Sequence, residues 1–147
     1  MSEKKQFCTF FLGPRMFGVE VVKIQEVLRY QEMTEVPLAP PVIRGLLNLR
    51  GSIVATLDLR RRFGMSAAED GALPTNVVSQ TSTGLISLLV DRIGDVVEVD
   101  QESFEPSPET LDGEGRSLID GVYKLASGLL MILNVERALE LEPARNV

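Results

Sequence analysis

The 147-residue sequence predicts a mainly β protein on three observations. Most apolar stretches are short and alternate with polar residues at the period of a strand. Glycine, proline, asparagine and serine separate these stretches at intervals that suit hairpins. Only short segments show the three-and-four spacing of a helical face. We expect about nine strands and three short helices, which places the chain in the mainly β class.

One stretch, 45–60, shows how an apolar segment turns into an alternating strand. The segment Gly45-Leu46-Leu47-Asn48-Leu49-Arg50-Gly51 ends in an arginine and a glycine. The strand that follows has Ile53, Ala55, Leu57 and Leu59 on one side and Ser52, Val54, Thr56 and Asp58 on the other. This period predicts a half-buried strand. Asp58 is then expected to cap a short helix through Phe63, with Gly64 ending it.

The remaining elements follow in order. Strands are expected at 7–12, 17–21, 76–80, 85–90, 95–100, 121–125 and 128–133, with Gly94 bending or interrupting the chain. The spacing of Val21, Ile24, Val27 and Leu28 predicts a short helix, and Asn134 is expected to cap another over 135–139. Three prolines make 32–41 an edge segment, while 65–74 and 101–116 are predicted loops.

The length suits one domain over residues 1–147 that is built of two small lobes. The polar loop 65–74 is the candidate seam between the lobes. We place the lobes at 15–65 and 75–140, and a strand at 6–12 that packs with either of them.

The charge and the sequence termini bear on partners and location. A formal net charge of −6 disfavours nucleic acids and anionic membranes as partners. The only basic cluster is Arg60-Arg61-Arg62, for which a solvated helix face is favoured over a phosphate site. No leader-type segment opens the chain, and no apolar run has the roughly 18 residues of a membrane span. We therefore expect a soluble cytoplasmic protein without direct membrane insertion.

Few residues could support catalysis. Cys8 is the only cysteine, so no intrachain disulfide can form, and histidine is absent altogether. Asp91, Asp95, Glu98 and Asp100 leave one route to acid–base chemistry. Alternation places Glu98 and Asp100 on one side of a strand, where an ordinary solvent-exposed face is the favoured reading. The sequence shows no nucleotide-binding or metal-binding motif, so we expect no cofactor, no metal and no enzyme activity. A small β-barrel enzyme that uses carboxylates is the remote alternative.

Two charged residues lie in apolar surroundings: Glu26 in the predicted helix, and Arg50 after three leucines. We expect the Arg50 guanidinium to fork across the Glu26 carboxylate and fix the helix to the start of the strand. Removing one partner of such a buried pair would cost about 3–5 kcal/mol. The alternative is that both side chains are solvated.

Several motifs in order resemble the family of the chemotaxis coupling protein CheW, over about residues 6–140. They are Phe17-Gly18-Val19-Glu20-Val21, Ile24-Gln25-Glu26-Val27, Val36-Pro37, Val42-x-x-Gly45, Asn48-Leu49-Arg50-Gly51, Asp58-Leu59-Arg60, Leu89-Val90-Asp91, Val96-Val97, Gly121-Val122 and Leu130 to Leu133. The sequence departs from the family pattern at Ala55-Thr56, where proline and valine are frequent, and at Asn134, where aspartate is common.

The resemblance implies two SH3-like five-stranded barrels packed together. It also implies a non-enzymatic adaptor that links the cytoplasmic tips of methyl-accepting chemoreceptors to the regulatory domain of the histidine kinase CheA. Such an adaptor would be located at receptor arrays on the inner face of the membrane. The alternative within the family is an adaptor of a chemosensory pathway that controls pili or development instead of flagellar motility.

Site residues also follow from the resemblance. The receptor-binding groove would contain Val21, Ile24, Glu26, Val77 and Val96, with an amphipathic helix of the receptor lying in it. The kinase-binding face would contain Val36, Leu38, Arg44 and Leu46. The alternative for each valine is a place in the core. Gly45 and Gly51 are expected to serve backbone geometry and not binding directly.

Overall fold

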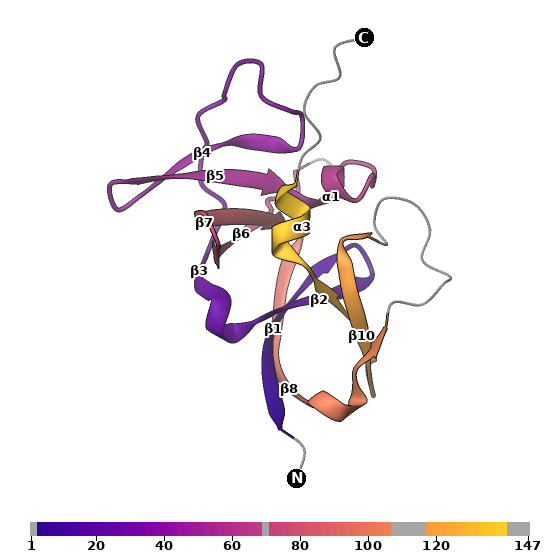
Figure 1. Ribbon diagram of the computed structural model, residues 1–147. Coiled ribbons are helices and arrows are strands. Elements are labelled where there is room, and N and C mark those ends of the chain that lie inside the picture. The colour runs from indigo at the N-terminus through magenta and orange to yellow at the C-terminus, as the bar shows by residue number, and fades with distance from the viewer. Residues whose placement is uncertain (1–2, 69–70, 107–116, 141–147) are drawn as a thin grey trace.

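Two β-sheets, joined by short helices, make up the computed structural model, which describes residues 3–68, 71–106 and 117–140 (Figure 1). The first sheet has six strands in the order β8-β1-β2-β11-β10-β9. Its strands are β1 (Lys4–Leu12), β2 (Arg15–Glu20), β8 (Arg92–Asp100), β9 (Glu105–Pro106), β10 (Ile119–Leu125) and β11 (Gly128–Leu133). All neighbours in this sheet are antiparallel except β2 and β11, which are parallel.

The second sheet has five strands in the order β3-β6-β7-β5-β4. Its strands are β3 (Ile24–Leu28), β4 (Ile43–Leu49), β5 (Ser52–Asp58), β6 (Thr75–Thr81) and β7 (Gly84–Val90). The helices are short: 3-10 turns η1 (Val21–Lys23) and η2 (Gln101–Ser103), and α-helices α1 (Leu59–Arg62) and α3 (Val135–Leu139). The prediction of a mainly β fold is confirmed.

The predicted hairpins and helix caps are confirmed. β1 pairs with β2, β6 with β7, and β10 with β11. The side chain of Asp58 accepts a hydrogen bond from the backbone nitrogen of Arg61 and caps α1, and Asn134 caps α3 through the nitrogen of Arg137. The sequence analysis did not predict β3, β4 or β9 as strands, so the described residues hold eleven strands instead of about nine.

The helix predicted over 21–28 is wrong. Only η1 is helical there, and the chain continues as β3, in which Val27 pairs with Val77 of β6. Valine and isoleucine carry β-branched side chains that fit a strand better than a helix. Hydrogen bonds to a strand about fifty residues away therefore outweigh a local apolar spacing that suits either element.

The strand β8 runs through Gly94 and does not end there, but its pairing with β1 is interrupted at this point, as the expected bend or interruption at Gly94 requires. A Cβ atom at this position would lie 2.5 Å from Oγ1 of Thr9 and 2.9 Å from Cε2 of Phe11. The register with β1 shifts here, because Cys8 pairs with Val96 and Phe10 with Ile93, so that Gly94 and Asp95 of β8 lie opposite Thr9 alone. Gly94 thus lies in a bulge of β8 at which the neighbouring strand also approaches closely.

The sheets draw their strands from both of the predicted lobes. β2 belongs to the first predicted lobe but lies in the six-stranded sheet, whereas β6 and β7 belong to the second and lie in the five-stranded sheet. The chain therefore crosses between the sheets twice, at η1 and between β7 and β8. The N-terminal strand β1 pairs with β2 and β8, both in the six-stranded sheet.

Most of the core lies between the two sheets. Its main cluster combines residues of the six-stranded sheet, such as Phe10 and Phe17, with Leu57, Val77 and Leu88 of the five-stranded sheet. A smaller cluster within the six-stranded sheet contains Phe7, Val99, Tyr123, Leu130 and Ile132. Burial of this apolar surface is the main force that holds the sheets together.

The strand β5 is buried on both faces over its second half, and one of these faces contributes Leu57 to the main core. Thr56 and Leu57 are both fully buried, although they point in opposite directions. Near the turn, by contrast, Ile53 is exposed and Val54 is buried. The predicted half-buried alternation therefore does not extend along the whole strand.

The predicted edge segment at 32–41 runs beside β4. Thr34 and Leu46 exchange two backbone hydrogen bonds, of 3.0 and 2.8 Å. Since β3 and β4 are the outer strands of their sheet, the segment carries the chain from one outer strand to the other. A Cβ atom at Gly45 would lie 2.8 Å from the carbonyl oxygen of Thr34, so glycine here permits the segment to approach.

Candidate functional site

The predicted pair of Glu26 and Arg50 forms. The Arg50 nitrogens Nη1 and Nη2 donate to Oε1 and Oε2 of Glu26 at 2.8 and 3.0 Å. Arg50 and Gly51 have φ values of 50° and 89° and form the turn between β4 and β5, where Asn48 accepts a hydrogen bond from the Gly51 nitrogen. The pair therefore connects the two outer strands of the five-stranded sheet.

The expected burial of this pair is wrong. The Arg50 side chain is 74% exposed, although that of Glu26 is only 18% exposed. The pair also ties β3, not a helix, to the turn. Water can solvate the guanidinium if the carboxylate is removed, so the contribution to stability is about 0.5–1 kcal/mol and not that of a buried pair. Its charged groups remain at the surface, where a partner can reach them.

The residues expected in the receptor groove fall into three settings. Val21, Ile24 and Glu26 are half-buried along η1 and β3. Val77 lies on the neighbouring strand β6 and is fully buried in the main core. A place in the core was the alternative expected for each valine. Val96 lies on β8, in the other sheet, and is 58% exposed. Val22, which the sequence analysis did not select, is the most exposed valine of η1.

The residues expected on the kinase face lie along the outer edge of the five-stranded sheet. Leu38 is fully exposed and has a φ of 67°, an unusual backbone conformation for leucine. Val36 is also exposed, whereas Leu46 is half-buried beneath the edge segment. A hollow of about 440 Å³ lies here, lined by Tyr30, Met33, Glu35, Val36, Ala39, Pro40, Pro41, Ile43, Arg44 and Arg61.

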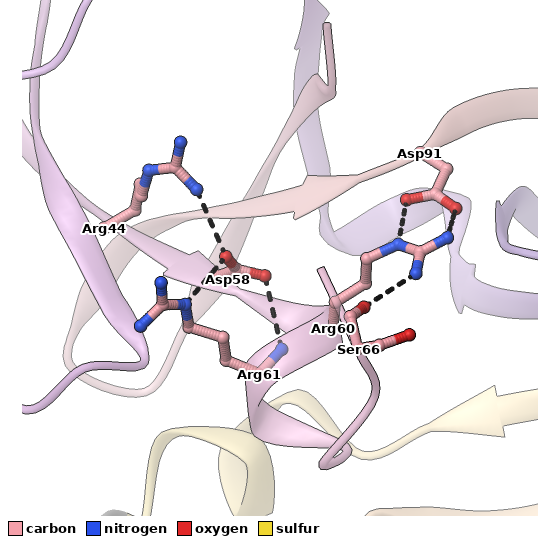
Figure 2. A network of polar contacts seen from close by, with 6 residues as sticks. All are labelled: Arg44, Asp58, Arg60, Arg61, Ser66 and Asp91. Carbon is pink, nitrogen blue, oxygen red and sulfur yellow. Dashed lines mark hydrogen bonds and ion pairs between the residues drawn. The ribbon is translucent and has the colours of Figure 1, made fainter. Parts of the chain in front are cut away.

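The arginine run forms specific contacts, which corrects the expectation of a simply solvated helix face. Figure 2 shows Arg60 forking across the carboxylate of Asp91, with Nε–Oδ1 and Nη2–Oδ2 distances of 2.7 and 2.5 Å. Arg61 lies 3.7 Å from Oδ2 of Asp58, which Arg44 also approaches, at 3.4 Å. Nothing in this geometry marks the run as a dedicated phosphate site.

Asp91 lies where the chain passes from β7 to β8, between the two sheets. Besides Arg60, its carboxylate accepts a hydrogen bond from the Gly13 nitrogen in the turn between β1 and β2, at 2.7 Å. The hydrogen bonds from Arg60 hold the pKa of Asp91 below its usual range, despite the opposing effect of partial burial. This carboxylate therefore joins α1 to the opposite sheet as a charged group.

Two further contacts join the sheets. Arg62 donates to the carbonyl oxygens of Ala138, Arg137 and Glu140 at the end of α3. Glu136 accepts from the backbone nitrogen and the hydroxyl of Ser82, in the turn between β6 and β7, at 2.7 and 2.8 Å. These two bonds lower the pKa of Glu136. Helix α3 is thus tied to the five-stranded sheet at both of its ends.

The carboxylates considered for catalysis do not converge. Asp91 is held by Arg60, Glu98 lies on the exposed face of β8 at 3.8 Å from Lys4, and Asp95 is exposed. The carboxylate of Asp100 has one oxygen, Oδ1, that is buried and has no hydrogen-bond partner. Within residues 3–68, 71–106 and 117–140, no group of three or more histidine, cysteine or acidic side chains is placed to hold a metal. Burial raises the pKa of the Cys8 thiol.

Comparison with known proteins agrees with this architecture. The family model described as the CheW-like domain matches residues 6–142. The chain belongs to the CheW-like domain family. It is 28% identical to the chemotaxis protein CheW of Treponema pallidum, over 92% of this chain and 82% of that protein. It is 28% identical to the CheW of Klebsiella aerogenes, over 94% of this chain and 83% of that one.

The fold matches a solved member of the family as well. The crystal structure of the scaffolding protein TtCheW from Thermoanaerobacter tengcongensis superimposes with a TM-score of 0.86 at 25% identity, over 95% of both chains. The two SH3-like lobes implied by the resemblance are therefore present. With its CheW relatives and this scaffold structure, the chain is a chemotaxis coupling adaptor of the CheW type. No helix among the residues that the structure describes is long and apolar enough to span a membrane.

The sequence analysis missed the residues that join the sheets. Asp91 was considered as a possible acid, and Arg60 and Arg62 as solvated charges. A local signal was available for Asp91, because it directly follows the apolar run Leu88-Leu89-Val90, as Arg50 follows its leucines. Arg62 offers no such signal, because its acceptors are backbone carbonyls that lie more than seventy residues away.

Proposed function

We propose that this CheW-type adaptor couples the cytoplasmic tips of chemoreceptors to the regulatory domain of a CheA-type histidine kinase. It catalyses no reaction and works at receptor arrays on the inner face of the membrane. The match of a coupling-protein family over residues 6–142 is the observation that carries the proposal. The geometry of two exposed surfaces on one protein supports it.

The first surface, the receptor patch, consists of Val21, Ile24, Glu26 and Val96. It also includes the exposed Val22, and the buried Val77 lies on β6, beside β3, where it pairs with Val27. An amphipathic receptor helix would place its apolar side against the valines and isoleucine. The Glu26–Arg50 pair would then set one polar boundary of the contact, since the Arg50 side chain is 74% exposed.

The second surface, the kinase patch, consists of Val36, Leu38, Arg44 and Leu46. Leu38 has no intramolecular reason to be fully exposed at a left-handed φ, and exposed apolar residues at a sheet edge commonly mark protein contacts. The patch lies at β4, the outer strand opposite β3 in the same sheet. The five-stranded sheet thus carries the kinase patch and, with η1, most of the receptor patch, to which β8 of the other sheet adds Val96.

Coupling follows from this arrangement in terms of free energy. A receptor that changes how tightly it binds the first surface can bias the kinase on the second only if the adaptor transmits a coupling free energy. Weak pairwise contacts suffice in an array, since linked sites raise the effective concentration of each partner.

The decisive experiment reconstitutes receptor membranes with a CheA-type kinase from the same cell and measures phosphorylation from labelled ATP, with and without the adaptor. We expect the adaptor to place kinase activity under receptor control. Leu38→Asp should weaken kinase binding and spare receptor binding, whereas Val22→Asp should do the reverse. Unchanged phosphorylation with every candidate kinase of the cell would contradict the proposal.

A further inference from the structure

Two neighbouring hollows at the kinase patch share Arg44 and Arg61. The larger, of about 690 Å³, is also lined by Asp58, Arg60 and Asp91, and by the chain on either side of residues 69–70. The smaller, of about 440 Å³, is lined by Glu35 and Val36. Arg44 and Arg61 therefore lie between the two hollows, the smaller of which contains Val36 of the kinase patch.

In the larger hollow, three arginines share two aspartates. Arg60 and Asp91 satisfy each other through two short bonds. The carboxylate of Asp58 lies near both Arg44 and Arg61. Its oxygen Oδ2 is 3.4 Å from Nη1 of Arg44 and 3.7 Å from Nε of Arg61 (Figure 2). Its other oxygen, Oδ1, accepts the backbone nitrogen of Arg61 in capping α1.

At these distances, both arginines can still form stronger hydrogen bonds with a second carboxylate. A strong charge-assisted contact between a guanidinium and a carboxylate is about 2.7–2.9 Å long and often has two parallel bonds. The side chains of Arg44 and Arg61 are 46% and 55% exposed, and each guanidinium has more N–H donors than the contact with Asp58 uses. A second carboxylate that arrives from outside could be held between them.

The surroundings favour a carboxylate on a protein surface. The chain has a net charge of −6, whereas the charged residues that line the larger hollow among the described residues are three arginines and two aspartates. This excess of one positive charge favours an acidic partner. Glu35 lines only the smaller hollow, where its negative charge would turn an incoming carboxylate toward the larger one. Val36 lines the smaller hollow with both arginines, and the exposed Leu38 follows it two residues along the chain, so the two offer an apolar contact that a free anion could not use.

We propose that Arg44 and Arg61 together bind an aspartate or glutamate side chain of the kinase regulatory domain, next to the apolar contact at Val36 and Leu38. The assignment rests on the proposed function, and it names the chemistry of the partner at that surface: an acidic side chain beside an apolar one. The arginines would supply specificity and a salt-dependent association rate, and the apolar residues most of the desolvation.

The test measures calorimetric affinity of the full-length adaptor for the kinase regulatory domain at several NaCl concentrations. Arg44→Gln and Arg61→Gln should each weaken binding by about fivefold, and the double variant by about 30-fold with a flatter salt dependence. Lys4→Gln/Lys124→Gln removes the same charge from exposed positions in the other sheet and should change affinity by less than about twofold. Thermal unfolding establishes that each variant is folded.

The outcomes separate the two proposals. If wild-type adaptor binds the kinase domain and Leu38→Asp abolishes binding, but the double arginine variant binds like wild type, the carboxylate site is wrong and the adaptor function stands. If wild type does not bind the domain, both are wrong. Wild-type affinity that does not change with salt would also overturn the site, even if the double variant fails to fold. Competition by inorganic phosphate at low millimolar concentration would identify a free-anion site instead.

Discussion

Two arginine–carboxylate pairs of almost identical chemistry perform different tasks in this protein. Arg60–Asp91 and Glu26–Arg50 are both bidentate, with donor–acceptor distances between 2.5 and 3.0 Å. The side chains of Arg60 and Asp91 are 18% and 22% exposed. In the other pair the Glu26 side chain is equally buried, with 18% exposed, but that of Arg50 is 74% exposed, so the pairs differ in the burial of the arginine. Asp91 also accepts a hydrogen bond from the backbone nitrogen of Gly13, in the turn between β1 and β2, whereas the carboxylate of Glu26 is held by the Arg50 guanidinium.

This difference decides what each pair contributes. Asp91 stabilises the junction where the chain passes between the sheets, so its loss affects the relation of the two lobes. The Glu26–Arg50 pair links two outer strands of a single sheet and keeps charged atoms at the surface. Bidentate geometry alone therefore does not predict the contribution to stability; burial and additional partners do.

The largest expected effect comes from Asp91→Asn. Removing the charge leaves Arg60 partly buried without its carboxylate, and the free energy of unfolding should fall by about 2–4 kcal/mol, somewhat less than for a fully buried pair. Urea denaturation measures this loss. Asp95→Asn, an exposed carboxylate on the following strand, is the matched control and should change stability by less than about 0.5 kcal/mol. If both variants lost the same free energy of unfolding, the structural role of Asp91 would be contradicted.

The pH dependence sharpens the same comparison. Because the pKa of Asp91 is lower in the folded chain than in the unfolded chain, its stabilisation is fully present above the usual aspartate pKa and is lost as the pH falls through the lowered value. The stability difference between wild type and Asp91→Asn should be constant near neutral pH and shrink below about pH 4. Unfolding at a series of pH values tests this, and a difference that grows with acid would contradict it.

The smallest effect is expected from the surface pair. Glu26→Gln and Arg50→Met should each lower the free energy of unfolding by about 0.5–1 kcal/mol. In the double variant, the losses should be less than additive by an amount that fades in about 1 M NaCl, since the exposed charges are screened. A double-mutant cycle measures the coupling. Fully additive losses would contradict the pairing of Glu26 with Arg50. A coupling that persisted in high salt would contradict its exposure to solvent.

Much of the fold could be predicted from local patterns. The hairpins β1–β2, β6–β7 and β10–β11 have alternating apolar residues on both sides of turn residues, and Asp58 and Asn134 stand where caps are needed. The stretch 21–28 was assigned wrongly because its spacing suits a helix, while its β-branched residues and its partner strand β6 favour a sheet. β4 was missed for a related reason, because an apolar run without alternation does not identify its element.

The candidate site was predicted less completely. Glu26 and Arg50 could be matched because each charge interrupts an apolar stretch. Val77 could not be assigned from the sequence, since a valine in a strand looks the same whether it faces a partner or the core, and here it is fully buried. Arg44 and Arg61 both contact the carboxylate of Asp58 because β4, β5 and α1 meet at this point, which the sequence does not show.

The strand class, the turns, the caps and the family can be predicted from the sequence, because they depend on residues that are close together in the chain. Only the tertiary structure decided which of its charges are structural and which are available to partners. Strand β3 became a strand by pairing with β6, and Asp91 became a junction because α1 and the β1–β2 turn both reach it. Such contacts join residues tens of positions apart, and their strength depends on burial that no local pattern records.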